Sequence, residues 1–172
     1  MPGTISQMQV SYNPEEDRIL FRVNTTSKQV FSFWITHRYG VLLAKVLKEH
    51  LESDPDIVLQ GSPEARQAIK TFKQSQANSN ADFDKAFDEA VAEQPLGPET
   101  LLAFKLNYSI QGSNLHLGLE PKAGQGINMV INRDINASLT TLLQAAANRA
   151  GWSLEGGAVS PQPLQPVPPV VN

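Results

Sequence analysis

The sequence predicts an α+β fold built from two strand–strand–strand–helix halves. Apolar residues recur at every second position and then at every third or fourth, which is typical of strands that lead into an amphipathic helix. This change occurs near residue 36 and again near residue 132. At an offset of 96 residues, Phe31 aligns with Ile127 and Thr36 with Asn132. We therefore expect an internal repeat; the alternative is one α+β domain with two unrelated helices.

The first half, residues 4–53, reads as three strands and a helix. Residues 5–12 and 18–25 alternate between apolar and polar side chains, and short turns favour antiparallel pairing. Residues 29–35 are apolar on both faces, which predicts a central strand that is covered on both sides. Thr36 suits the N-cap of the following helix, whose apolar stripe is Tyr39, Leu42, Leu43, Val46, Leu47, His50 and Leu51.

Residues 57–98 differ in character and predict a helical insertion between the halves. Ser62 and Pro63 form a helix start, and residues 81–93 give a second amphipathic pattern after a polar break at 74–80. Residues 54–100 include nine acidic and four basic side chains, a net charge of −5, whereas residues 1–53 and 101–172 carry +1 each. We therefore expect an acidic insertion.

The second half, residues 100–152, repeats the order of the first. Residues 101–111 alternate strictly and predict one continuous strand, which a turn at 112–114 joins to a strand at 115–119. Residues 127–131 predict the third strand, and Asn132 caps a helix that ends near Gly151. The rest, residues 153–172, contains five prolines and two adjacent glycines, which predicts a flexible, disordered tail.

The composition excludes several classes of protein. The chain has no cysteine, so it forms no disulfide and holds no thiolate nucleophile or Cys-based zinc site. Its first residues lack the basic and apolar regions of a signal peptide, and no apolar run approaches the roughly 18 residues that span a bilayer. We therefore expect a soluble cytoplasmic protein without membrane contact. A pI of ≈ 5.6 does not favour a nucleic-acid partner.

No residue pattern predicts catalysis, a metal or a cofactor. His37, His50 and His116 lack the mutual spacing and the accompanying carboxylates of a metal site. No G-x-S-x-G elbow is present, and the glycine-containing segment 124–126 lacks the Lys and Ser/Thr of a phosphate-binding loop. That segment is interpreted as a turn, and an enzyme is not the favoured class.

The two strand-to-helix junctions are candidate anion-binding sites. A helix N-terminus presents unpaired N–H groups and the positive end of the helix dipole, and an adjacent arginine adds charge. The candidates are His37, Arg38 and Tyr39 at the first junction and Asn132 and Arg133 at the second. The alternative is that the two arginines pair with neighbouring acidic side chains.

The polar face of the predicted sheet is a second candidate binding surface. Its residues are Arg22, Gln29, Lys105, Asn107 and His116. A curved antiparallel sheet with basic, polar and aromatic side chains is a platform for single-stranded nucleic acid. Few aromatic residues fall on the polar positions, which weakens base stacking.

The segments D-R-I-L-F-R-V-N-T (17–25) and F-S-F-W-I-T-H-R (31–38) resemble small bacterial proteins to which no activity is assigned. The resemblance covers about residues 5–51 and implies neither a substrate nor a cofactor. In outline, two sheet-then-helix halves are also similar to the PUR/Whirly class of single-stranded nucleic-acid binders. That similarity is one of topology alone, because no motif of the class is matched and fold does not imply function.

Three hypotheses for function are open. The first is a non-catalytic binding or adaptor protein that contacts a protein partner or its own copies. The second is binding of single-stranded nucleic acid by the sheet face. The third is an enzyme with a small-molecule pocket between helix and sheet. The lack of a catalytic set, together with a strand that is apolar on both faces and an acidic insertion, favours the first.

Overall fold

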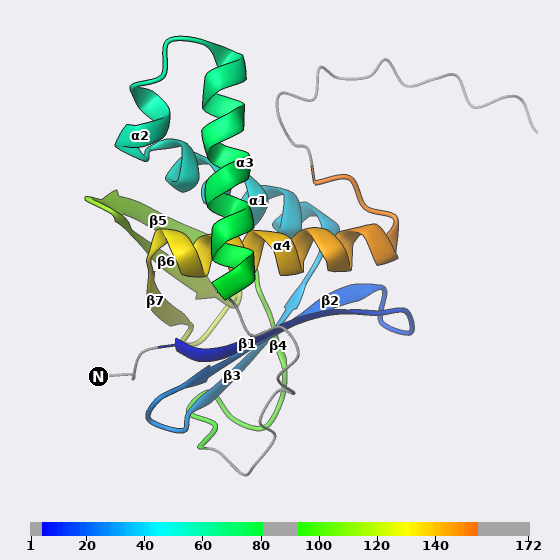
Figure 1. Cartoon of the computed structure of the whole chain (residues 1–172). Coiled ribbons are helices and arrows are strands. Elements are labelled where there is room, and N and C mark those ends of the chain that lie inside the picture. Colours follow the sequence, from blue (N-terminus) through cyan, green and yellow to red (C-terminus); the bar gives the residue numbers. More distant parts are fainter. Residues whose placement is uncertain (1–4, 81–92, 155–172) are drawn as a thin grey trace, which may run out of the picture.

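The computed structural model describes residues 5–80 and 93–154 (Figure 1). Within these residues it confirms the mixed α+β class. The strands are β1 (Ile5–Asn13), β2 (Arg18–Thr25), β3 (Val30–Ile35), β4 (Leu101–Leu102), β5 (Lys105–Gln111), β6 (Asn114–Glu120) and β7 (Ile127–Ile131). The helices are α1 (His37–Glu52), α2 (Pro55–Val58), α3 (Pro63–Asn80) and α4 (Arg133–Ala150). The predicted helix at 81–93 and the predicted tail lie almost wholly outside the described residues.

The strands form two sheets, with the orders β1-β2-β3-β4 and β5-β6-β7. β3 lies inside the first sheet, as its two apolar faces predicted. In the β2/β3 register, Phe21 pairs with Phe33 and Ile19 with Ile35, and all four side chains are fully buried. One continuous apolar core joins this face to the inner face of the second sheet and to α1 and α4.

The predicted continuous strand 101–111 is divided into β4 and β5, because the chain changes partner at Ala103 and Phe104. The Ala103 N–H donates to the Trp34 carbonyl over 3.0 Å, whereas the Phe104 N–H donates to the Glu120 carbonyl over 2.8 Å. Lys105 lies opposite Glu120, so the chain pairs with β6 from this residue onwards. The short β3/β4 pair is parallel, and the insertion provides the long crossover that a parallel pair needs.

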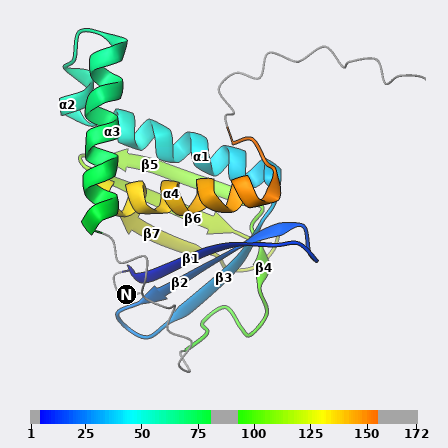
Figure 2. The ribbon, with the colours of Figure 1, turned by 45° about the vertical axis from the view of Figure 1, so that its right-hand side comes forward.

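The helices α1 and α4 run antiparallel beside each other, and each contacts the sheet of the other half. α1 contacts β5, and α4 contacts β1 (Figure 2). Thr36 and Asn132 cap the two helices in the same way, since each side chain accepts a hydrogen bond from the N–H three residues later. α4 also contacts β7 of its own half, so it packs on both sheets, and the internal repeat stays a prediction.

The insertion begins as predicted but does not break where predicted. Ser62 Oγ accepts from the Ala65 N–H over 3.1 Å at the start of α3. The predicted break at 74–80 is wrong, because α3 continues to Asn80 and is supported by contacts with α4. The sequence did not indicate α2, which the Asp54 side chain caps. No helix in the described part of the chain combines the length and the apolar character needed to cross a membrane.

Candidate functional site

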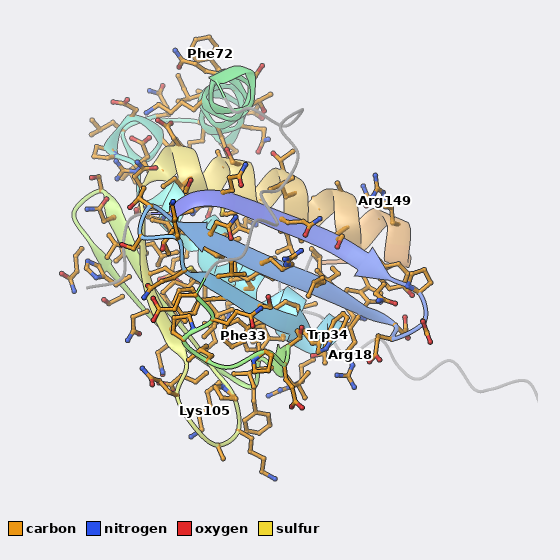
Figure 3. All side chains as sticks on the ribbon, turned by 90° about the horizontal axis from the view of Figure 1, so that it is seen from below. Arg18, Phe33, Trp34, Phe72, Lys105 and Arg149 are labelled. Carbon is orange, nitrogen blue, oxygen red and sulfur yellow. The ribbon has the colours of Figure 1, made fainter. Side chains whose placement is uncertain are left out.

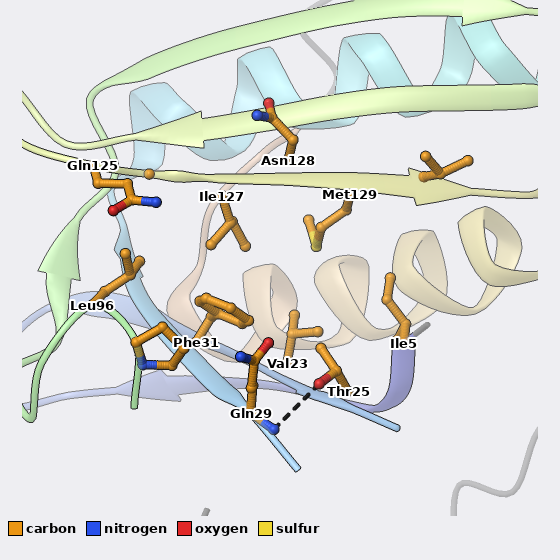
Figure 4. Close-up of a pocket in the computed structure, with 13 residues that line it drawn as sticks. Ile5, Val23, Thr25, Gln29, Phe31, Leu96, Gln125, Ile127, Asn128 and Met129 are labelled. Carbon is orange, nitrogen blue, oxygen red and sulfur yellow. Dashed lines mark hydrogen bonds between the residues drawn. The ribbon is translucent and has the colours of Figure 1, made fainter. Parts of the chain in front are cut away.

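An open pocket of about 740 Å³ lies between the ends of the two sheets (Figure 4). Val23 of β2 and Phe31 of β3 line one wall, and Ile127 and Met129 of β7 line the opposite wall. Leu96, in the segment before β4, also lines it. The volume falls within the roughly 300–1,000 Å³ that is usual for ligand pockets.

The pocket is apolar on its inside and uncharged throughout its described lining. Its polar residues are Thr25, Gln29, Gln125 and Asn128, which carry only amide and hydroxyl groups. The Gln29 backbone N–H donates to Thr25 Oγ1 over 3.2 Å and so fixes the rim. This lining suits apolar groups and neutral hydrogen-bond partners, whereas it offers no side chain for acid–base catalysis.

The pocket follows the edge of β7 rather than one of its faces. The six consecutive residues 125–130 all contribute to the lining. In Figure 4, Ile127 and Met129 point from β7 towards Phe31 and Val23, and Asn128 points the other way. β7 is the last strand of its sheet, and no other strand among the described residues pairs with its outer edge. The site is therefore a hollow bordered by an unpaired strand edge.

Gly126, just before β7, allows the backbone to pass close to the end of β6. A Cβ atom at this position would lie 2.1 Å from the Leu119 carbonyl oxygen, a distance that no side chain tolerates. The segment 124–126 is therefore a close backbone approach that leads the chain from β6 into β7, in agreement with its interpretation as a turn.

Two of the three residues of the first predicted anion site, His37 and Tyr39, make contacts within the fold, and the site itself stays a prediction. The His37 ring stacks on Trp152 with a centroid distance of 5.1 Å, and its Nε2 lies 2.9 Å from the Ser153 carbonyl oxygen. Tyr39 is buried, and its hydroxyl donates to the Lys105 carbonyl over 2.9 Å. Burial, followed by the charge of Glu120, raises the pKa of Tyr39 well above its usual value, so the hydroxyl stays protonated. Arg38 is exposed.

The second predicted anion site lies at the other end of the helix pair, beside an acidic side chain. Arg133 Nε is 4.0 Å from Asp54 Oδ2, and Asp54 also accepts from Lys73. This ion pair is long, and the buried Arg133 Nε makes no hydrogen bond to a protein atom, so an anion site at this junction stays a prediction. Asn132 caps α4 through a 2.8 Å bond from the Ile135 N–H. The structure does not bring the two junctions together.

The predicted sheet-face residues do not share one face, because the chain forms two sheets. Arg22 lies on the first sheet, where its Nη1 donates to Gln9 Oε1 over 3.3 Å. Lys105, Asn107 and His116 lie together on the second sheet, on the face away from the core. Gln29 lines the pocket.

The outer face of the second sheet is polar and close to neutral. Lys105 lies directly opposite Glu120, and Ser109 lies opposite His116. Among the described residues of β5, β6 and β7, no Phe, Tyr or Trp points to this face. Stacking of nucleobases therefore has no platform here.

A buried polar network was missed by the sequence interpretation. Asn136 Nδ2 donates to His50 Nδ1 over 2.7 Å and to the Leu47 carbonyl over 3.0 Å. His50 Nε2 then donates to the Ser113 carbonyl over 2.9 Å, and Thr140 Oγ1 donates to Asn136 Oδ1. The network ties α1, α4 and the β5–β6 turn together. The placement of His50 on the inner helix stripe was the one available signal.

One of the exposed apolar side chains lies on α3, away from the pocket. Phe72 is 66 % exposed and points away from the rest of the molecule (Figure 3). Phe72 does not line the pocket between the sheets.

No protein-family model, curated protein sequence or solved structure matches this chain. The interpretation of the pocket therefore depends on its geometry. The described residues also contain no group of three or more His, Asp or Glu side chains placed to hold a metal ion.

Proposed function

We propose that this chain is a non-catalytic, cytoplasmic binding protein that recognises a segment of another protein in the pocket between the sheets. The observation that supports this proposal most strongly is the combination of an apolar, uncharged lining with an open strand edge. Apolar hollows on a protein surface commonly mark sites of interaction.

The lining favours binding over catalysis. A reaction at this site would need a base, an acid or a nucleophile within hydrogen-bond reach of the bound molecule. Thr25 is the only hydroxyl in the described lining, which includes no carboxylate, amine or imidazole side chain. The proposal therefore assigns recognition to the pocket.

The proposal is tested by filling the pocket. Linear dodecapeptides, randomised at every position and displayed on phage, are selected on the immobilised full chain. Leu96→Trp places a larger side chain in the pocket, and Leu102→Trp is its matched control because Leu102 is exposed and lies outside the lining. A second control, Phe72→Ser, alters an exposed apolar side chain on α3 that does not line the pocket.

The expected result is a set of peptides that bind the unmodified chain and both controls but lose about tenfold or more in affinity for Leu96→Trp. Unchanged circular dichroism of Leu96→Trp shows that its fold is kept. If no peptide is enriched, or if the enriched peptides bind Leu96→Trp equally well, the pocket is not a peptide-binding site.

A further inference from the structure

We infer that the partner segment binds as an added β-strand along the free edge of β7, with alternate apolar side chains inserted into the pocket. This inference rests on the proposed function and specifies the conformation and the chemistry of the partner. Strand addition uses backbone hydrogen bonds for affinity and pockets for alternate side chains for specificity.

The hydrogen-bond pattern shows which groups of β7 face outwards. Gln111 and Asn114 close a two-residue turn at Gly112 and Ser113 and so form a hydrogen-bonded pair. Pairs alternate along an antiparallel ladder, so residues 114, 116, 118 and 120 of β6 bond to β5. Residues 115, 117 and 119 then bond to Ile131, Met129 and Ile127 of β7.

The backbone groups of Asn128 and Val130 are consequently directed away from β6. Both side chains are exposed, and the exposed fraction of Val130 is 50 %. An extended chain placed beside β7 would meet these two N–H and C=O pairs at the spacing of a normal ladder.

Side-chain alternation then decides what the added strand must carry. Its residues on the face shared with Ile127 and Met129 would enter the pocket, beside Val23 and Phe31. Its residues on the face shared with Asn128 would point to solvent. Because no charged side chain is present in the described lining, the inserted residues are apolar and the intervening ones polar.

A second copy of this chain fits the hollow less well than a separate segment. The β7 strand of a second copy would bring Ile127, Met129 and Ile131, which are already buried in its own core. Pairing of two β7 strands would therefore leave both pockets unfilled. A separate segment has apolar side chains that are not already buried elsewhere. It can therefore form hydrogen bonds with the edge of β7 and fill the pocket at the same time.

The test uses a proline at an outward position. Val130→Pro removes an N–H that β6 does not use and places a ring on the free edge, while it leaves the pocket-lining faces of Ile127 and Met129 in place. Val130→Thr is the matched control, since it keeps the N–H and the β-branched shape. Affinities of the phage-selected dodecapeptides are measured as synthetic peptides by fluorescence anisotropy.

The expected result is that the peptides alternate apolar and polar residues, bind Val130→Thr as they bind the unmodified chain, and bind Val130→Pro about tenfold more weakly or worse. Equal binding to Val130→Pro would overturn strand addition, while sensitivity to Leu96→Trp would keep the proposed function. Failure of the proposed function is distinct, because no pocket-dependent peptide would then be found. A dimer in light scattering that Val130→Pro dissociates would instead assign the edge to a second copy and overturn the inference.

Discussion

At the scale of single residues, buried polar groups decide which substitutions the chain tolerates. His50 and Asn136 are both fully buried, and every polar atom of the Asn136 amide group has a partner. A buried polar group that loses its partner keeps the cost of its desolvation without the compensating hydrogen bond. The sequence placed His50 on the inner stripe of α1, but Asn136 stands 86 positions away and gave no signal of its own.

We expect Asn136→Ala to lower the free energy of unfolding by about 1–3 kcal/mol, because it leaves His50 Nδ1 and the Leu47 carbonyl without their donor. Urea denaturation followed by circular dichroism measures the change. Asn148→Ala, at an exposed position of the same helix, is the control and should change it by no more than about 0.5 kcal/mol. Equal effects of the two substitutions would contradict the role of the network.

The lowered pKa of Asp54 predicts that the stability of the chain depends on pH. Burial alone would raise its pKa, but the hydrogen bonds from Lys73 and the Asp56 N–H, with the charges of Lys73 and Arg133, outweigh burial and hold the pKa below its usual 3.8. A carboxyl group whose pKa is lower in the folded state stabilises the fold above its unfolded pKa. That contribution is lost as the pH falls through the folded pKa.

We therefore expect Asp54→Asn to destabilise the chain near pH 7 and to have a much smaller effect at about pH 2.5. Urea denaturation at both pH values gives the two differences in the free energy of unfolding. Asp56→Asn is the matched control, since the Asp56 side chain also contacts Lys73 but is 68 % exposed and should contribute less. A pH-independent effect of Asp54→Asn would show that its charge is not responsible.

At the scale of secondary-structure elements, side-chain periodicity predicted most strands and helices, whereas pairing decided where they end. Residues 101–111 alternate without interruption, so no residue type marks the partner change at Ala103 and Phe104. Likewise, Ile127 and Met129 carry the same alternation as any core-facing residue of a strand. The open edge of β7 depends on sheet order, which periodicity does not specify.

The entry into β7 gives a prediction at this scale. Gly126→Ala should destabilise the chain by about 1–3 kcal/mol, because its Cβ would meet the Leu119 carbonyl and force the β6–β7 connection apart. Thermal denaturation measures the loss. Gly61→Ala is the control, since a Cβ there meets nothing within 4 Å and the stability should stay within about 0.5 kcal/mol. A neutral Gly126→Ala would contradict the close approach.

At the scale of the whole molecule, the contacts of each helix with the sheet of the other half tie the two halves together. α4 follows the second sheet in the chain but contacts β1, and α1 follows the first sheet but contacts β5. The sequence predicted two halves of equal order, and the helix caps follow that prediction. The sequence did not indicate these contacts. Its periodicity shows that a helix has an apolar face, but not which sheet covers that face.

We expect the chain to unfold in one cooperative transition, since residues of both halves form one continuous apolar core. Trp34 lies in β3, and Trp152 lies just after α4 with its ring stacked on His37, so the variants Trp34→Phe and Trp152→Phe each keep one fluorescent reporter in the first half of the molecule. Their fluorescence transitions in urea should coincide with each other and with the loss of circular dichroism. A fluorescence midpoint that differs from the circular-dichroism midpoint would indicate halves that unfold independently.

The unpaired edge of β7 is most directly tested by amide hydrogen exchange, residue by residue, in the free protein. The N–H groups of Ile127, Met129 and Ile131 should exchange slowly, because they bond to β6. Those of Asn128 and Val130 should exchange rapidly and become slow only when a selected peptide is added. Slow exchange of Asn128 and Val130 in the free protein would show that the edge is already covered and would contradict the binding site derived from it.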